Sequence, residues 1–223
     1  MLKGIWLTIC FISCSFCVLA NDEVFKISAP LIAQIAPELE RKIIQSYKDI
    51  DIAAEIIHLP TQRSLESAIK SDWVDAELAR VAEVSDLLKD YIKVPIPVFE
   101  FTLNSFSFQK SINASSWLSL KPYKVVTLRG FVSINRRLKE HGIEHFVTDS
   151  YEQAVAMLKA KRVDVLITSK TLLSKKLLNA MNASKEFHSN EIEAVNLYHY
   201  IHKRHKTILP RITHAIKQNF SKN

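Results

Sequence analysis

Three histidines near the carboxyl end have a spacing that could bind a metal ion. His199, His202 and His205 lie three residues apart, and a metal site needs two or three such nitrogens converging on one point. On a helix, this spacing would place the three rings on one face. The neighbouring Tyr198 and Tyr200 instead indicate a strand that runs into a turn, which would splay the rings apart. The pattern therefore favours a structural role, and we predict neither a metal site nor a cofactor.

The three cysteines of the chain, Cys10, Cys14 and Cys17, all lie within residues 1–20. This segment starts with the basic Lys3, continues as an apolar run over 5–19 and ends with small residues up to Ala20, a pattern typical of a secretory signal peptide. We expect cleavage after Ala20 and a periplasmic mature protein. That protein would contain no cysteine, which excludes disulfides, catalytic thiols and zinc–thiolate sites.

The N-terminal segment has two alternative interpretations. An uncleaved anchor helix is disfavoured, because the run over 5–19 is shorter than the roughly 20 residues that span a bilayer. A lipoprotein would carry its lipid on Cys14 or Cys17, but the residues before each lack the expected Leu-small-small pattern. We therefore expect no stable insertion in the membrane.

The charge pattern argues against a nucleic-acid partner. Lys and Arg number 30 against 23 Asp and Glu, a formal net charge of +7, but the basic residues are scattered along the chain. They form no stripe interleaved with stacking aromatics, and export removes nucleic acid as a partner. No glycine surrounds a serine as in a nucleophile elbow, so the sequence offers little for nucleophilic catalysis.

Strands and helices alternate along the chain in two blocks. Strand patterns cover 24–30, 51–59, 74–80, 91–108, 123–128, 143–147, 163–168 and 192–201. Helical patterns cover 31–47, 62–73 (with Thr61 as its N-cap), 131–140, 151–162, 170–181 and 207–220, while 81–89 is helical or a loop. This order predicts an α/β protein of two lobes with largely parallel sheets. The long segment 91–108 and the return after 182–190 would be the two crossings between lobes.

Several motifs, taken in order, resemble the extracellular solute-binding protein family 3, the type II periplasmic binding proteins. They cover essentially all of the mature chain and lie at 59–69 (LPTQRSLESAI), 74–80 (VDAELAR), 123–130 (YKVVTLRG), 150–158 (SYEQAVAML), 162–167 (RVDVLI) and 197–205 (LYHYIHKRH). The resemblance implies a two-lobed type II periplasmic-binding-protein fold, each lobe a mainly parallel sheet flanked by helices, joined by a hinge of two crossings. We assign 21–99 plus 191–223 to lobe 1 and 100–190 to lobe 2.

The resemblance also implies where a ligand would bind. Arg63 and Arg80 match family positions at which an arginine holds a ligand carboxylate, and a planar guanidinium suits that task. The alternative for each is an arginine on the surface or in lobe packing. Arg129, Gly130 and Phe131 match the turn where the second lobe donates backbone amides to an anion, although Phe131 replaces the usual hydroxyl residue.

The strand over 163–168 departs from the amino-acid binders that the chain resembles. Those proteins typically place an aspartate at its end to pair with the ligand ammonium, and here Ser169 followed by Lys170 stands there. This change weakens the case for a free amino acid and favours a neutral or anionic ligand. Phe99, Phe101 and Tyr123 could stack on it, but core packing is the expected role of each.

The resemblance predicts a non-enzymatic, monomeric periplasmic protein that captures a small polar or anionic ligand for an ABC transporter. Two alternatives remain open at this point. One is a sensory or partner-binding module with the same fold, which would contact a sensor protein rather than an ABC permease. The other is a lyase or dehydratase acting on small carboxylic acids, for which Glu77 beside Arg80 is the nearest candidate acid–base group.

Overall fold

The computed structural model describes residues 24–30 and 36–221. The predicted signal peptide over 1–20 lies outside these residues. The described strands form one sheet in the order β2-β1-β3-β8-β4-β7-β5-β6. The strands are β1 (Phe25–Pro30), β2 (Ala54–Leu59), β3 (Ala76–Val81), β4 (Tyr91–Ser107), β5 (Val125–Leu128), β6 (His145–Thr148), β7 (Val165–Thr168) and β8 (His188–His202).

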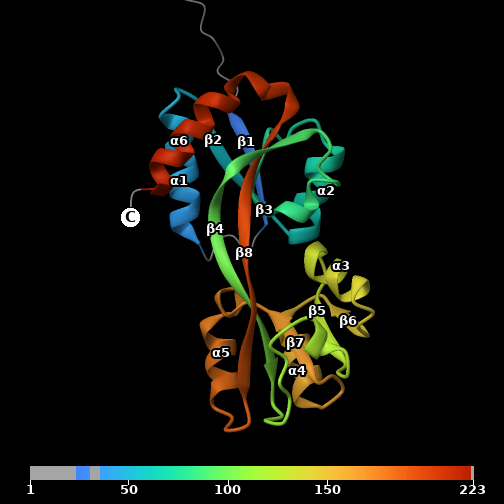
Figure 1. The fold of residues 1–223 in the computed structure, drawn as a ribbon. Helices are drawn as coiled ribbons and strands as arrows, with labels where there is room; N and C mark the ends of the chain where they lie inside the picture. The colour runs from blue at the N-terminus through green and yellow to red at the C-terminus, as the bar shows by residue number, and fades with distance from the viewer. Residues whose placement is uncertain (1–23, 31–35, 222–223) are drawn as a thin grey trace, which may run out of the picture.

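Two long antiparallel strands join the two halves of the molecule. β4 and β8 pair from Tyr91 opposite His202 to Ser107 opposite His188, and both run through the upper and lower lobes in Figure 1. In lobe 1, β1 pairs in parallel with β2 and β3. In lobe 2, β5 pairs in parallel with β6 and β7. The parallel sheets of the lobes are therefore continuous through the crossing strands.

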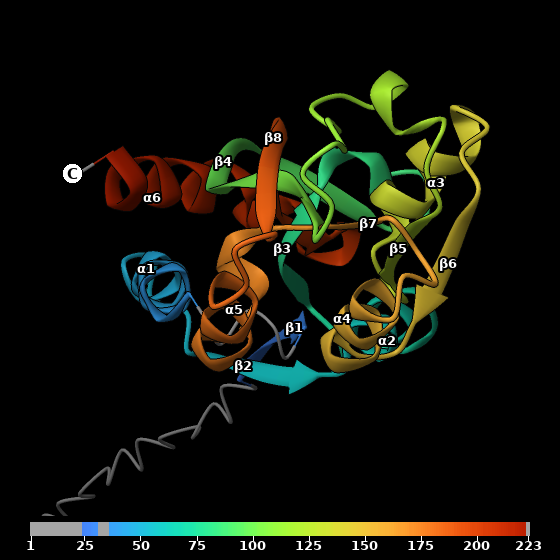
Figure 2. The same ribbon diagram turned by 90° about the horizontal axis from the view of Figure 1, so that it is seen from below.

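Helices cover both lobes. They are α1 (Pro37–Lys48), α2 (Thr61–Lys70), α3 (Val132–Glu140), α4 (Tyr151–Lys159), α5 (Lys175–Asn182) and α6 (Leu209–Ser221), with short 3-10 helices η2 (Ala82–Val84), η3 (Leu118–Leu120), η4 (Lys170–Leu172) and η5 (Lys203–Ile208). Helices α1 and α6 lie side by side on lobe 1 (Figures 1 and 2), where Asn219 Nδ2 donates to Ser46 Oγ at 3.0 Å. The helix α6 thus packs on the same lobe as α1.

Each lobe has its own hydrophobic core. In lobe 1, Ile27, Ile43 and Leu78 are fully buried among residues of β1, α1, β3 and α6. In lobe 2, β4, β5 and β7 bury apolar side chains on both sides of the sheet, against α3 and α4. The lobe boundaries predicted at 99/100 and 190/191 fall inside β4 and β8, and they remain a prediction.

Two details of the predicted elements are corrected, and a third is described only in part. Thr61 is not an N-cap: Pro60 occupies that position, and Thr61 is the first residue of α2. The helix predicted over 170–181 is divided into η4 and α5, because Ser174 caps a new helix by accepting a hydrogen bond from the Leu177 amide. Of the helix predicted over 31–47, residues 31–35 lie outside the described residues, and α1 starts at Pro37.

Among residues 24–30 and 36–221, no helix combines the length and the apolar character needed to cross a membrane.

Candidate ligand-binding site

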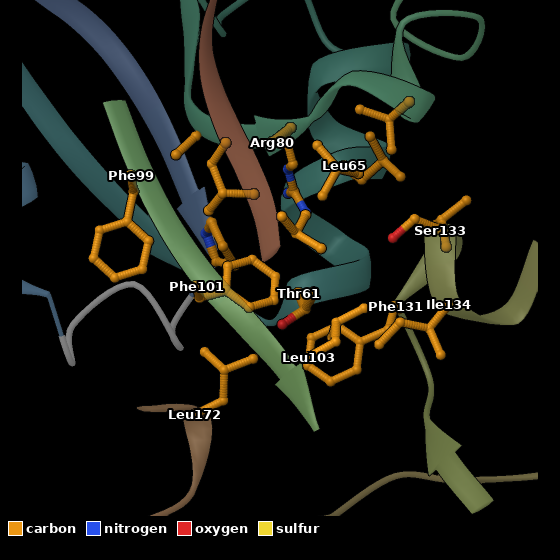
Figure 3. A pocket seen from close by; sticks show the side chains of 18 of the residues that line it. Thr61, Leu65, Arg80, Phe99, Phe101, Leu103, Phe131, Ser133, Ile134 and Leu172 are labelled. Carbon is orange, nitrogen blue, oxygen red and sulfur yellow. The ribbon is translucent and has the colours of Figure 1, made fainter. Parts of the chain in front are cut away.

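A cavity of about 120 Å³ lies where the two lobes meet (Figure 3). Lobe 1 contributes the start of α2 and the end of β3, and lobe 2 contributes the segment 130–134. The crossing strands close it with Phe99, Phe101 and Leu103 from β4 and Val195 and Leu197 from β8. Because both lobes line it, a change in their relative position would change the cavity.

Gly130 lies at the lobe-2 wall of this cavity, in the turn between β5 and α3. Its φ of +89° is a conformation that favours glycine, and the Asn135 side chain holds the turn by donating to the Leu128 carbonyl at 3.2 Å. A Cβ on Gly130 would lie 3.1 Å from Thr61 Cγ2, across the lobe junction. The absence of a side chain therefore allows the two lobes to approach closely at this point.

Among the described residues that line the cavity, Arg80 is the charged one. Its side chain is hydrogen-bonded to other residues of lobe 1. Its Nε donates to Glu77 Oε2 at 2.6 Å, and its Nη2 donates to Ser64 Oγ at 2.8 Å. Ser64 Oγ in turn donates to Glu77 Oε1 at 3.0 Å. The exposed fraction is 8% for Arg80 and 0% for Glu77. The pair is thus a buried, internally satisfied unit with Arg80 toward the cavity and Glu77 behind it.

Of the six residues predicted to bind a ligand, Arg80, Gly130 and Phe131 line the cavity. Arg63 is exposed on α2 and does not line it. Arg129 is also exposed, and its Nε donates to Asp149 at 2.6 Å. Ser169 is buried, and its Oγ accepts a hydrogen bond from the Thr171 amide at the start of η4. A ligand-binding role for any of the six stays a prediction.

The rest of the lining is largely apolar, and the sequence did not identify most of it as a site. Phe99 and Phe101, expected as core residues, line the cavity, whereas Tyr123 packs against the lobe-2 core. The other apolar lining residues are Pro30, Ala36, Leu39, Leu65, Ala79, Val81, Val84, Leu103, Val132, Ile134, Leu172, Val195 and Leu197. Apolar residues in strands and helices look alike whether they face a core or a cleft, so no sequence signal marks them.

One rim of the cavity carries ion pairs between the lobes. Arg136 on α3 donates from Nη1 to the Glu83 carbonyl at 3.0 Å and from Nη2 to Asp86 Oδ2 at 3.0 Å. The next residue, Arg137, pairs with Glu83 and with Glu193 of β8. These contacts connect α3 of lobe 2 to η2 and the turn after it in lobe 1.

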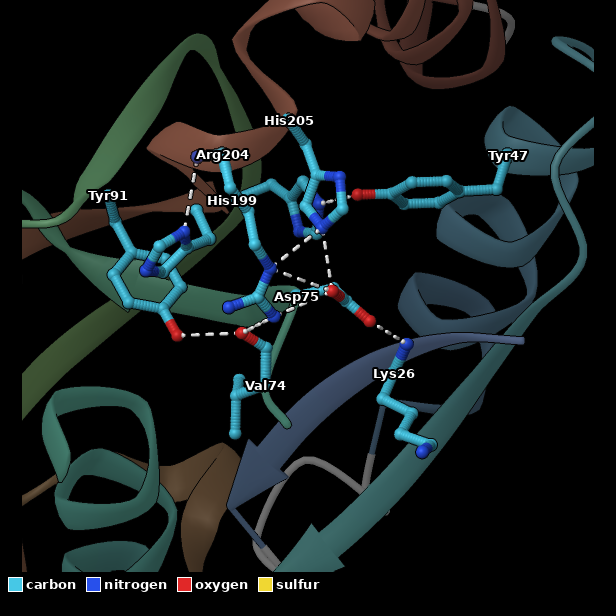
Figure 4. A network of polar contacts seen from close by, with 9 residues as sticks. Lys26, Tyr47, Val74, Asp75, Tyr91, His199, Arg204 and His205 are labelled. Atoms are coloured by element: carbon cyan, nitrogen blue, oxygen red, sulfur yellow. Dashed lines mark hydrogen bonds and ion pairs between the residues drawn. The ribbon is translucent and has the colours of Figure 1, made fainter. Parts of the chain in front are cut away.

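The three histidines do not converge. His199 is buried, its Nε2 contacts the Tyr47 hydroxyl at 2.8 Å and its Nδ1 donates to the Leu78 carbonyl at 3.0 Å. His205 instead contacts Asp75 at 2.6 Å (Figure 4). The part of the chain that the structure describes holds no group of three potential metal-ligating side chains.

Asp75 is the centre of the polar network in Figure 4. Its Oδ2 accepts from the Lys26 amide at 2.8 Å, and its Oδ1 accepts from Arg204 Nη2 at 2.7 Å. Burial alone would raise the pKa of Asp75, but these hydrogen bonds and the contact with His205 outweigh it and lower that pKa. The network ties the start of β3 to β1 and to η5, on the side of lobe 1 away from the cavity.

Comparison with known proteins shows the fold. No family model matches the chain. An uncharacterized protein of Shewanella oneidensis is 26% identical over 160 residues, and the chain spans 59% of the length of that relative. The GluR0 ligand-binding core in complex with L-glutamate superposes with a TM-score of 0.69 at 12% identity, covering 90% of this chain and 94% of that chain.

Two further structures extend the comparison. A histidine kinase sensor domain with similarity to periplasmic binding proteins gives a TM-score of 0.66 at 14% identity, over 88% of this chain and 90% of that chain. An ancestral arginine-binding protein bound to arginine gives 0.61 at 15% identity, over 89% of this chain and 93% of that chain. The chain therefore has the α/β fold of the type II periplasmic binding proteins, and the predicted fold class is confirmed.

Proposed function

We propose that this chain is a periplasmic solute-binding protein that captures a small molecule between its lobes and presents it to an ABC transporter. The cavity that both lobes line, with Arg80 on one wall and Gly130 and Phe131 on the other, is the observation that carries the proposal. Clefts between α/β lobes bind ligands beyond the strand ends, and closure around a ligand is a hinge motion. The role is binding rather than catalysis.

The comparisons support this proposal at the level of the fold. The GluR0 core and the ancestral arginine-binding protein are described with L-glutamate and arginine bound. The dehydratase alternative is disfavoured because its candidate acid, Glu77, is fully buried and bound to Arg80 and Ser64. An acid–base group must reach the proton that it transfers.

A thermal-shift screen of the mature chain tests ligand capture. A ligand present at about 100 times its Kd adds about 2.7 kcal/mol to the stability of the folded state. For a chain of this size, that raises Tm by roughly 5–10 °C. The cavity variant Val132→Trp should abolish the shift, while Val147→Trp, on the exposed part of β6, should keep it. A broad screen without any shift would contradict the proposal.

Export is tested separately. Mass spectrometry of protein released from the periplasm should find an N-terminus at Asn21, because we expect cleavage after Ala20. Recovery of the full chain in the cytoplasmic fraction would contradict the periplasmic location.

A second candidate function is a sensory module of the same fold, and the likeness to a histidine kinase sensor domain favours it. The two functions differ in the partner. Crosslinking in the periplasm should capture a permease if the chain serves transport, and a membrane kinase or cyclase if it serves sensing.

A further inference from the structure

The cleft between the lobes offers an apolar surface with one positive group. The described lining consists mostly of aliphatic and aromatic side chains, and Arg80 is its charged member. The chemistry of the ligand therefore depends on how much of the Arg80 charge is available.

Most of that charge is already balanced. The Glu77 carboxylate lies 2.6 Å from Arg80 Nε and is buried behind it, so the two side chains together are neutral. Ser64 accepts from Nη2, and no hydrogen bond from Nη1 to another described residue is found. Arg80 can thus offer a ligand hydrogen bonds from Nη1, but its charge is shared with Glu77.

Among the described residues that line the cavity, none is an acid that could receive a ligand ammonium. Glu77 has no exposed surface, and Ser169, at the position where the resemblance predicts an aspartate, is buried and caps η4. Outside the cavity, the Glu38 carboxylate lies in an adjoining hollow, pairs with Arg41 and belongs to a side chain that is 61% exposed, and the Glu83 carboxylate at the rim pairs with Arg137. An ammonium that enters the cavity would lose its water and could gain the hydroxyls of Thr61 and Ser133, but no carboxylate would balance its charge, which is strongly unfavourable.

We propose that the cleft selects a small apolar ligand that has no ammonium group and presents a single hydrogen-bond acceptor to Arg80. The cavity of about 120 Å³ has the size of roughly one aromatic ring, since a cavity of about 150 Å³ is known to hold benzene. Phe99, Phe101 and Phe131 supply aromatic surface for such a ring. This inference rests on the proposed ligand-binding function and names the class of its ligand.

The test compares probes that differ by one group. Phenylacetate and L-phenylglycine share a ring and a carboxylate and differ by the ammonium, and 2-phenylethanol replaces the carboxylate by a neutral hydroxyl. Isothermal titration of the mature wild-type chain should show that phenylacetate, 2-phenylethanol or both bind at least tenfold more tightly than L-phenylglycine, L-glutamate and L-arginine.

Two results would overturn the inference, and they are distinguishable. If an amino acid binds more tightly than both ammonium-free probes, the ligand class is wrong while ligand capture stands. If neither these probes nor a broad solute screen gives binding, ligand capture itself fails, and the inference fails with it.

A matched pair of variants places the binding in the cleft. Phe101→Ser removes an aromatic side chain from the cavity wall and should lower the affinity for the tighter-binding probe at least tenfold. Phe146→Ser removes a 40% exposed ring on β6 and should leave that affinity unchanged. Equal losses in the two variants would contradict binding at this site. The comparison of probes on the wild-type chain needs neither variant to fold.

Discussion

Acidification should destabilise the folded chain through His199 on the crossing strand β8. The ring is fully buried, with Nδ1 donating to the Leu78 carbonyl and Nε2 accepting from the Tyr47 hydroxyl. Burial lowers the pKa of His199 to about 4, from an ordinary value of 6.5, and the hydrogen bonds to the backbone oppose that effect only in part. His199 is therefore protonated at a higher pH in the unfolded chain than in the folded one.

The size and the pH window of this effect follow from the two pKa values. Because the folded-state pKa is depressed, the contribution is fully present above about pH 6.5 and is lost as the pH falls toward 4. The whole difference corresponds to roughly 3 kcal/mol of unfolding free energy. At about pH 5, some 2 kcal/mol of it should already be lost.

Urea unfolding at several pH values measures this loss. His199→Gln should keep an amide donor for Leu78 and an acceptor for Tyr47, but it cannot titrate. Between pH 7 and pH 5, the free energy of unfolding of the wild type should therefore fall by about 2 kcal/mol more than that of this variant. His214→Gln, an exposed site on α6, is the control and should follow the wild type. Nearby Asp75 also titrates, but it is present in all three proteins and cancels in the comparison. The same pH dependence in His199→Gln and the wild type would refute the reasoning.

Two further predictions concern the junction between the lobes. In urea unfolding, Gly130→Ala should lower the free energy of unfolding more than Gly142→Ala does. A positive φ costs either alanine roughly 1–2 kcal/mol. Only the alanine at position 130 would also place its Cβ 3.1 Å from Thr61, whereas a Cβ at position 142 meets nothing within 4 Å. Equal losses would show that the lobes do not meet at Gly130. Arg136→Gln should remove a partly exposed ion pair with Asp86, worth about 0.5 kcal/mol, and should raise the radius of gyration in low-salt X-ray scattering. Added salt should also raise the radius of gyration of the wild type, and it should raise that of the variant less. An identical response of the two proteins to salt would contradict this role of Arg136.

Much of the fold was predictable because it depends on patterns that are local in sequence. Alternation of strand and helix patterns indicated two α/β lobes, and the long apolar run over 91–108 indicated the crossing strand that the structure shows as β4. The division between η4 and α5 was missed, because the polar Ser174 interrupts an otherwise helical pattern by one side-chain hydrogen bond. Whether a helix continues past such a serine or begins anew at it depends on tertiary packing, which a local sequence pattern does not reveal.

The site was less predictable, and Glu77 and Arg80 show the physical reason. In a regular strand, residues three apart point to opposite faces, so a pattern of period two separates these side chains. In β3, however, Glu77 pairs with Tyr200 and Arg80 with Tyr198, so three steps along β3 match two along β8. The extra residue is a bulge, and it turns Glu77 and Arg80 toward the same side, where they form their ion pair.

That bulge changes what the resemblance alone implies for the cleft. An arginine at this position resembles a free carboxylate anchor, and it would make the cleft positive if no acid lay on the same face. With Glu77 buried 2.6 Å away, the cleft instead becomes nearly neutral and mainly apolar. A carboxylate that approaches Arg80 also approaches Glu77, and their repulsion cancels part of the attraction. One extra residue of backbone in β3 thus moves the expected ligand from a small polar or anionic molecule toward an apolar one.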